Sequence, residues 1–92
     1  MSDVTVSKNE AQSRWEAHLD GELAGFAKYR EADDTLIFDH TSVSSQFGGR
    51  GVAGELAKAS LDDARAHGKK VVPQCGFYSK FISKNPQYAD LT

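Results

Sequence analysis

The stretch QFGGRGVAGELAKA, residues 46–59, contains four glycines immediately before a segment with the pattern of a long helix. They are Gly48, Gly49, Gly51 and Gly54. Glycine inside a helix is less stable than alanine by about 1 kcal/mol, and no side chain of the usual N-cap types stands at this boundary. A helix that begins in this way needs something other than its own side chains to complete its first turn.

The helix is predicted from the residues that follow. Small and apolar side chains recur at the spacing of one helical face: Ala53, Leu56, Ala57, Ser60, Leu61 and Ala64. Gly68 suits the position just beyond the last turn, where a left-handed residue often ends a helix. KKVVP, residues 69–73, then has the pattern of a short strand. Because strand, helix and strand form a right-handed crossover, we expect the two strands to run parallel.

The first half of the chain has the alternation of antiparallel strands. Asp20-Gly21 and Asp33-Asp34 are turn signals between them. Strands are predicted at residues 4–6, 14–19, 23–30 and 35–43. Near the end, residues 76–84 have an apolar helical side, and Asn85-Pro86 stops that helix. The predicted fold is α+β: an antiparallel meander, a β-α-β unit and a short C-terminal helix.

Length and composition indicate a single small domain, residues 1–92. The chain is 39% hydrophobic and 26% charged, and its net charge of −2 is unlike that of a protein with a basic face for nucleic acid. We expect no membrane span, because no apolar run approaches about 18 residues. One cysteine forms no internal disulfide, so we expect a cytoplasmic location.

An anion would explain the glycines at the start of the helix. A helix start leaves about four backbone N–H groups unpaired beside a positive dipole end, and a phosphate can accept those hydrogen bonds. Glycine lets the phosphate approach the backbone closely. The alternative is a flexible glycine-rich loop without a ligand. A P-loop motif is missing, and a Rossmann site is disfavoured because the preceding strand ends a meander.

Several segments together resemble one family. VSSQFGGRGVAGEL, residues 43–56, is similar to the acyl-CoA pyrophosphate loop of the GNAT acetyltransferase superfamily. DGELAGFAKYR, DHTSV and VVPQCGFYSKFISKNPQY are similar to the small stand-alone GNAT-like domains of the YidJ-like, N-acetyltransferase-domain-containing type. The resemblance implies a GNAT-like fold that binds acetyl-CoA. It also implies that the strands at 35–43 and 69–73 splay apart around the pantetheine arm.

The superfamily loop [QR]-x-x-G-x-[GA] fits the chain in two registers. Literal matching takes Gln46, Gly49 and Gly51, whereas matching from the strand end and helix start takes Gly48, Gly51 and Ala53. We prefer the second register, because the helix start decides which N–H groups face phosphate. It leaves glycine where Gln or Arg is usual, and Arg50 could supply the missing charge or be a solvated loop residue. The cofactor-binding positions expected are Ser42, Val43, Gly48, Gly49, Arg50, Gly51, Val52, Ala53 and Gly54.

Three residues are candidates for catalysis. Cys75 follows the strand that ends at Pro73, and it could be a thiolate nucleophile, line the pantetheine channel, or be a small buried residue. His40 could take a proton from an amine, because imidazole titrates near neutrality. The tyrosine that many GNAT enzymes use as an acid falls at Phe81, and Tyr78 is the nearby substitute, or else a core aromatic.

The leading functional hypothesis is an acyl-CoA-dependent N-acetyltransferase that acts on an amine. A CoA-binding interaction module with little turnover is the alternative, because the chain is short and Phe81 has no hydroxyl. A hydrolase built on Cys75 and His40 is a weaker third hypothesis, since no oxyanion-hole motif supports it. We expect no metal site, and no stretch of sequence specifies the acceptor or the oligomeric state.

Overall fold

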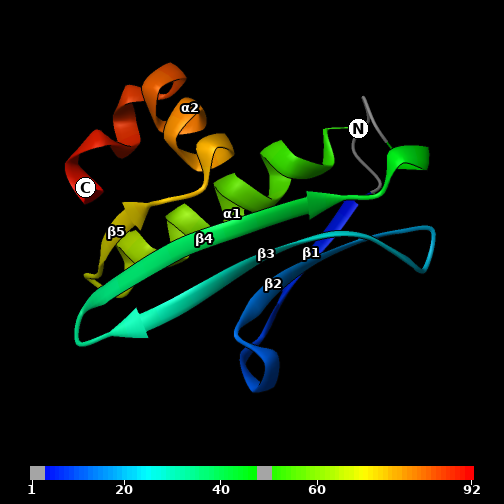
Figure 1. Ribbon diagram of the computed structural model, residues 1–92, viewed down its shortest axis with the longest axis horizontal. Helices are drawn as coiled ribbons and strands as arrows, with labels where there is room; N and C mark the ends of the chain where they lie inside the picture. The colour runs from blue at the N-terminus through cyan, green and yellow to red at the C-terminus, as the bar shows by residue number, and fades with distance from the viewer. Residues whose placement is uncertain (1–3, 48–50) are drawn as a thin grey trace.

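The computed structural model describes residues 4–47 and 51–92 (Figure 1). Five strands form one sheet in the order β1-β2-β3-β4-β5. They are β1 Val4–Asn9, β2 Arg14–Leu19, β3 Glu22–Ala32, β4 Thr35–Val43 and β5 Lys70–Pro73. The helices are α1 Val52–Ala66 and α2 Gly76–Lys84, with 3-10 turns at Glu10–Gln12, Ser45–Phe47 and Pro86–Leu91. No helix in the described parts of the chain is long and apolar enough to cross a membrane.

The predicted α+β architecture, an antiparallel meander followed by a β-α-β unit and a short helix, is confirmed. Strands β1 to β4 are an antiparallel meander, and β4 pairs with β5 in parallel after the α1 crossover. The meander turns at Asp20 and Asp33, whose φ values are 53° and 55°. Aspartate in a turn tolerates this left-handed conformation. Strand β1 is longer than its apolar pattern predicts, because Ser7, Lys8 and Asn9 pair through backbone groups that do not depend on side-chain polarity.

Pairing between β4 and β5 is short. It runs from Thr35↔Lys70 to Phe38↔Pro73, and β5 ends at that proline, which has no N–H to donate. Strand β4 continues through residues 39–43 beside β3, with no β5 partner along this stretch of the described chain. The two parallel strands therefore separate after Phe38, as the family resemblance implies.

A bulge in β4 changes which side chains face the helices. Tyr29 pairs with Phe38 and Lys28 pairs with His40, so Asp39 is an extra residue on β4. Because side chains alternate across a strand, the extra residue reverses the alternation beyond it. Phe38 lies on the helix-covered face before the bulge, and His40 lies on the opposite face after it.

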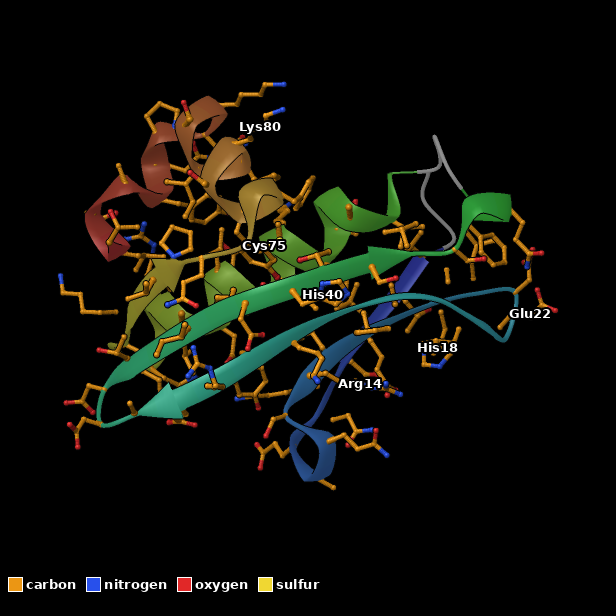
Figure 2. The ribbon with its side chains drawn as sticks, in the orientation of Figure 1. Arg14, His18, Glu22, His40, Cys75 and Lys80 are labelled. Carbon is orange, nitrogen blue, oxygen red and sulfur yellow. The ribbon has the colours of Figure 1, made fainter. Side chains whose placement is uncertain are left out.

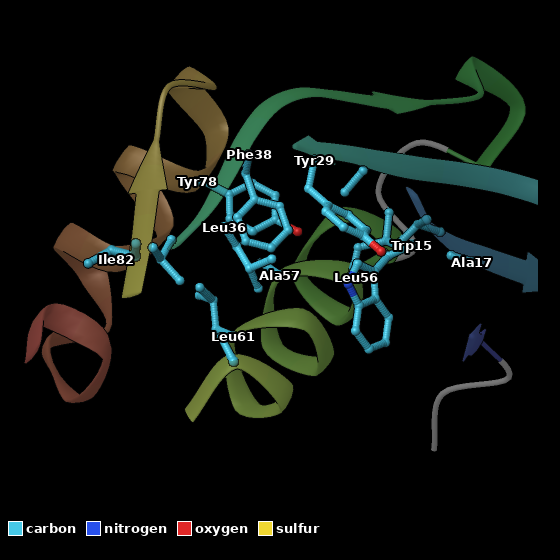
Figure 3. Close-up of a cluster of buried hydrophobic side chains, with 14 of the residues drawn as sticks. Trp15, Ala17, Tyr29, Leu36, Phe38, Leu56, Ala57, Leu61, Tyr78 and Ile82 are labelled. Carbon is cyan, nitrogen blue, oxygen red and sulfur yellow. The ribbon is translucent and has the colours of Figure 1, made fainter. Parts of the chain in front are cut away.

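The core lies between the sheet and α1 (Figure 3). Leu56 and Leu61 are fully buried from the predicted helical face, and burial of each stabilises the fold by about 1.5–3 kcal/mol. Val52, at 2% exposure, is buried in the first turn, whereas the predicted Ala53 is only half-buried. The Tyr78 ring of α2 stacks on Phe38 with centroids 4.4 Å apart, which holds α2 on the same face as α1.

Candidate active site

The separation of β4 from β5 is fixed by the chain that follows Pro73. The N–H of Cys75 donates to the carbonyl of Phe38 at 2.9 Å, a backbone hydrogen bond that follows the last β4–β5 pair. Cys75 is then the N-cap residue of α2, in an extended conformation, and its carbonyl accepts from the N–H of Ser79 at 3.1 Å. The residue is thus anchored at the point where the strands diverge.

The Cys75 thiol is half-buried and faces β4. Its sulfur lies 3.4 Å from the Thr41 hydroxyl oxygen. Burial raises the pKa of the thiol, but hydrogen bonds with the Thr41 side chain and with the backbone of Phe77, Tyr78 and Thr41 outweigh it. The net effect is a pKa below the ordinary value of a cysteine, which favours the thiolate as a nucleophile requires.

His40 lies on the other face of the sheet. Its cross-strand partner is Lys28, whereas Thr41 pairs with the buried Ala27 on the helix-covered face. The imidazole is exposed, and its ring centroid lies 6.0 Å from that of Phe26. Figure 2 labels His40 on β4 and Cys75 at the start of α2. No hydrogen bond joins these two residues in the described structure, so the geometry gives no support to a Cys75–His40 hydrolase.

Tyr78 is fully buried and its hydroxyl is already used. The phenol oxygen lies 2.7 Å from the hydroxyl oxygen of Ser60 on α1, and Ser60 in turn donates to the Leu56 carbonyl. Burial raises the pKa of the phenol well above its ordinary value, against a smaller opposing effect of Ser60. This position favours the core-aromatic interpretation, and a role as the acid stays a prediction.

The start of α1 has the properties predicted for a helix capped by something other than its own side chains. Gly51 is the N-cap residue with φ of 77°, and it makes no side-chain capping hydrogen bond. The N–H of Glu55 donates to the Gly51 carbonyl at 3.0 Å. A Cβ atom at Gly51 or Gly54 would meet no described atom within 4 Å. The predicted Gly48, Gly49 and Arg50 lie outside the described residues.

Gly25 brings the binding elements together, and sequence reasoning gave it no role. A Cβ atom on Gly25 would lie 2.7 Å from the Ser42 carbonyl oxygen and 3.2 Å from side-chain atoms of Val43 and Val52. Its missing side chain therefore lets β3 lie close to β4 and lets α1 begin beside both. The predicted backbone positions Ser42 and Val43 are on this part of β4, next to the helix start.

The order of these elements, the separation of the parallel strands and the helix start are those implied by the family resemblance. A family model described as GCN5-related N-acetyl-transferase matches residues 14–91. The chain belongs to this family.

One solved structure and two curated proteins are similar to this chain over different lengths. The NMR structure of a GCN5-like N-acetyltransferase candidate from Staphylococcus aureus is similar over 99% of this chain and 89% of that one, with a TM-score of 0.74 and 27% identity. Protein NATD1 of Xenopus tropicalis is 36% identical over 52 residues, 56% of this chain and 48% of that protein. Protein NATD1 of Bos taurus is 42% identical over 52 residues, 51% of this chain and 42% of its own length. These matches span about half of the NATD1 relatives.

Thr41 is the second residue that sequence reasoning did not assign to the site of this GCN5-related domain. It lies between the predicted His40 and Ser42 in DHTSV, so its position along the chain was known. Its contact with Cys75 depends on the bulge at Asp39, because without the extra residue Thr41 would face away from α2. A bulge of this kind has no clear signal in the sequence.

Proposed function

We propose that this domain transfers an acetyl group from acetyl-CoA to an amine. One observation carries the proposal: residues 39–43 of β4, which have no β5 partner in the described structure, run between the glycine-capped start of α1 and the Cys75 thiol. Membership of the GCN5-related family supports the same reaction class. The start of α1, the edge of β4 beyond its pairing with β5 and the thiol with the lowered pKa lie in the order that the pyrophosphate, the pantetheine arm and the thioester require.

The residues present fit acetyl-CoA in three ways. Backbone N–H groups of Val52, Ala53 and Gly54 would bind the pyrophosphate, because the first turn of a helix presents such groups and the described structure supplies no side-chain cap. Backbone groups of Ser42 and Val43 would bind the pantetheine arm, as alternate peptide groups of a strand without a neighbour point outward. When bound, acetyl-CoA supplies the electrophile, an acetyl thioester.

His40 would deprotonate the amine on the open face of the sheet. Its exposure allows an acceptor to approach, and β4 has no β5 partner beyond Phe38, so groups on the two faces can meet across its edge. In direct transfer, the amine nitrogen bonds to the acetyl carbon and the bond from that carbon to the coenzyme sulfur breaks. The coenzyme leaves as a thiolate, and His40 retains the proton of the amine until solvent removes it.

Cys75 offers a second route to the same product. Its thiolate would form a bond to the acetyl carbon as the coenzyme sulfur leaves with the bonding electrons. The amine would then attack the acetyl group on Cys75 and release the thiolate again. The lowered pKa of Cys75 supports this relay, while the half-buried position of the thiol also suits a residue that only lines the channel.

A matched pair of substitutions tests the binding site. Gly54→Asp and Gly54→Asn place side chains of nearly equal shape in open space, and they differ in charge. An aspartate near a helix start stabilises the helix, so loss of folding is not expected. We expect Gly54→Asp to weaken CoA binding at least tenfold relative to Gly54→Asn in calorimetric titration. Equal affinities, or no binding by the unmodified protein, would exclude this site.

The burial of Tyr78 favours one alternative, a CoA-binding module with little turnover. The Tyr78 hydroxyl is hydrogen-bonded to Ser60, and Phe81 has no hydroxyl. Neither residue therefore presents a phenol acid to the leaving thiolate. CoA affinity without acetyl transfer to any member of a panel of amines would select this alternative. Transfer to one amine, with CoA released in equal amount, would reject it.

A further inference from the structure

Thr41 and Cys75 meet across the opening between β4 and β5. Backbone pairing ends at Phe38↔Pro73, and three residues further along β4 the Thr41 hydroxyl reaches the Cys75 sulfur at 3.4 Å. The bulge at Asp39 turns Thr41 toward this side of the sheet. This side-chain contact therefore lies beyond the last backbone–backbone hydrogen bond between the two segments, which joins the Cys75 N–H to the Phe38 carbonyl.

The Cys75 backbone and the Thr41 residue are both held in place, so the main freedom left is rotation of the cysteine side chain. The Cys75 backbone is fixed by its hydrogen bonds with Phe38 and Ser79. Thr41 lies in the middle of the β3–β4 ladder opposite Ala27, and a β-branched residue in a strand has restricted χ1 rotation. The threonine is thus a rigid partner, and the orientation of the sulfur depends on it.

We propose that Thr41 is a positioning residue, whose hydroxyl orients the Cys75 sulfur toward the opening and donates a hydrogen bond to it when the thiol is ionised. The relevance to acetyl transfer rests on the proposed function. The positioning itself is a property of the free protein. A hydroxyl that donates to a thiolate stabilises the ionised form, and a methyl group in its place cannot.

The other titratable groups around Cys75 do not replace Thr41. Tyr78 on α2 is buried with its hydroxyl on Ser60. On β4, His40 faces the opposite side of the sheet, and Asp39 is paired with Arg30 at 3.3 Å. The remaining favourable interactions come from backbone groups, those of Phe77 and Tyr78 at the start of α2 and that of Thr41 itself, and a substitution of the Thr41 side chain keeps them. Removal of the hydroxyl should therefore be visible in the titration of the thiol.

The test measures the alkylation of Cys75 by iodoacetamide as a function of pH. Cys75 is the one cysteine of the chain, so the labelled thiol is unambiguous. We expect Thr41→Val to shift the reaction profile to higher pH and to lower the rate at pH 7 by about three- to tenfold, since one pKa unit is a tenfold change in thiolate. Thr41→Ser should keep the profile of the unmodified protein. Thr35→Val, at the far end of the same strand, is the matched control.

Thr41→Ala provides a second variant if Thr41→Val unfolds, and circular dichroism checks both. A folded variant of either kind with an unchanged profile would overturn the proposal, as would a shift equally large in Thr35→Val. Titration with CoA separates this result from the proposed function. If the unmodified protein does not bind CoA, acetyl transfer is rejected. A shift of the alkylation profile in Thr41→Val would still establish the role of Thr41.

Discussion

At the scale of single residues, the site depends on polar atoms whose partners lie far away in the sequence. The Tyr78 hydroxyl illustrates this, because its partner Ser60 is 18 residues earlier, on α1. Ser60 is itself fully buried, and its hydroxyl donates hydrogen bonds to carbonyl oxygens of its own helix. The hydrogen bond between Ser60 and Tyr78 links α1 to α2, and the Tyr78 hydroxyl therefore has a structural role.

The Tyr78→Phe substitution tests the structural role of the Tyr78 hydroxyl. The substitution removes one buried hydrogen bond and keeps the ring on Phe38, so we expect the free energy of unfolding to fall by about 1 kcal/mol in urea denaturation. Ser60→Ala, alone and combined with Tyr78→Phe, completes a double-mutant cycle that isolates the pair. If Tyr78 were instead the acid of an acetyltransferase, its loss would reduce turnover by about a hundredfold or more at unchanged stability.

At the scale of elements, the close approach of β3, β4 and α1 places the end of β4 beside the helix start. Gly25 permits this approach, since a Cβ atom there would collide with the Ser42 backbone. Gly76 is a useful contrast. It begins α2 with no described atom near the position of a Cβ, and its φ is not positive.

We therefore expect Gly25→Ala to destabilise the fold by about 1–3 kcal/mol, because the strands must move apart to fit one methyl group. Gly76→Ala should be neutral or slightly stabilising, as alanine is the better helix former. Urea denaturation of the two variants gives the comparison. Similar stabilities would mean that β3 and β4 can separate without loss, and Gly25 would have no structural role.

At the scale of the whole molecule, helices cover one face of the sheet, and the other face carries polar side chains together with apolar ones such as Phe26 and Val72. Glu16, on the open face, accepts a hydrogen bond from Asn9 at 3.0 Å and one from Arg14 at 2.7 Å. These two contacts, Asn9 first, lower the pKa of Glu16. The Arg14 guanidinium also lies over the Phe26 ring, 5.1 Å from its centroid, so the cluster ties β1, β2 and β3 together.

A lowered carboxylate pKa predicts the direction of a pH dependence. Glu16 titrates in the folded chain below the ordinary value of 4.5, so its contribution is complete above that pH and is lost as pH falls through the folded pKa. We expect the unfolding free energy of the unmodified protein to fall more steeply below about pH 4.5 than that of Glu16→Gln. Glu22→Gln, at the β2–β3 turn, serves as the control for the loss of one carboxylate. Parallel pH curves for Glu16→Gln and the unmodified chain would contradict the prediction.

Much of the fold could be predicted from the sequence, because its signals are local. Alternation gave the four meander strands, and helical spacing gave α1 and the parallel crossover. The left-handed Gly68, with φ of 67°, lies just beyond α1 as predicted. For the candidate site, the sequence correctly placed Gly51 at the helix start and Cys75 beyond β5. The binding and catalytic roles of these residues stay predictions.

The amino-acid sequence by itself determined the elements, their order and the residues that could carry chemistry, since each depends on neighbours within a few positions. Only the tertiary structure decided which of those residues meet. Asp39 is an extra residue in β4, and it can be recognised as extra only when the pairing of β4 with β3 is known. By reversing the side-chain alternation, the bulge sends His40 to the open face and brings Thr41 to the Cys75 sulfur.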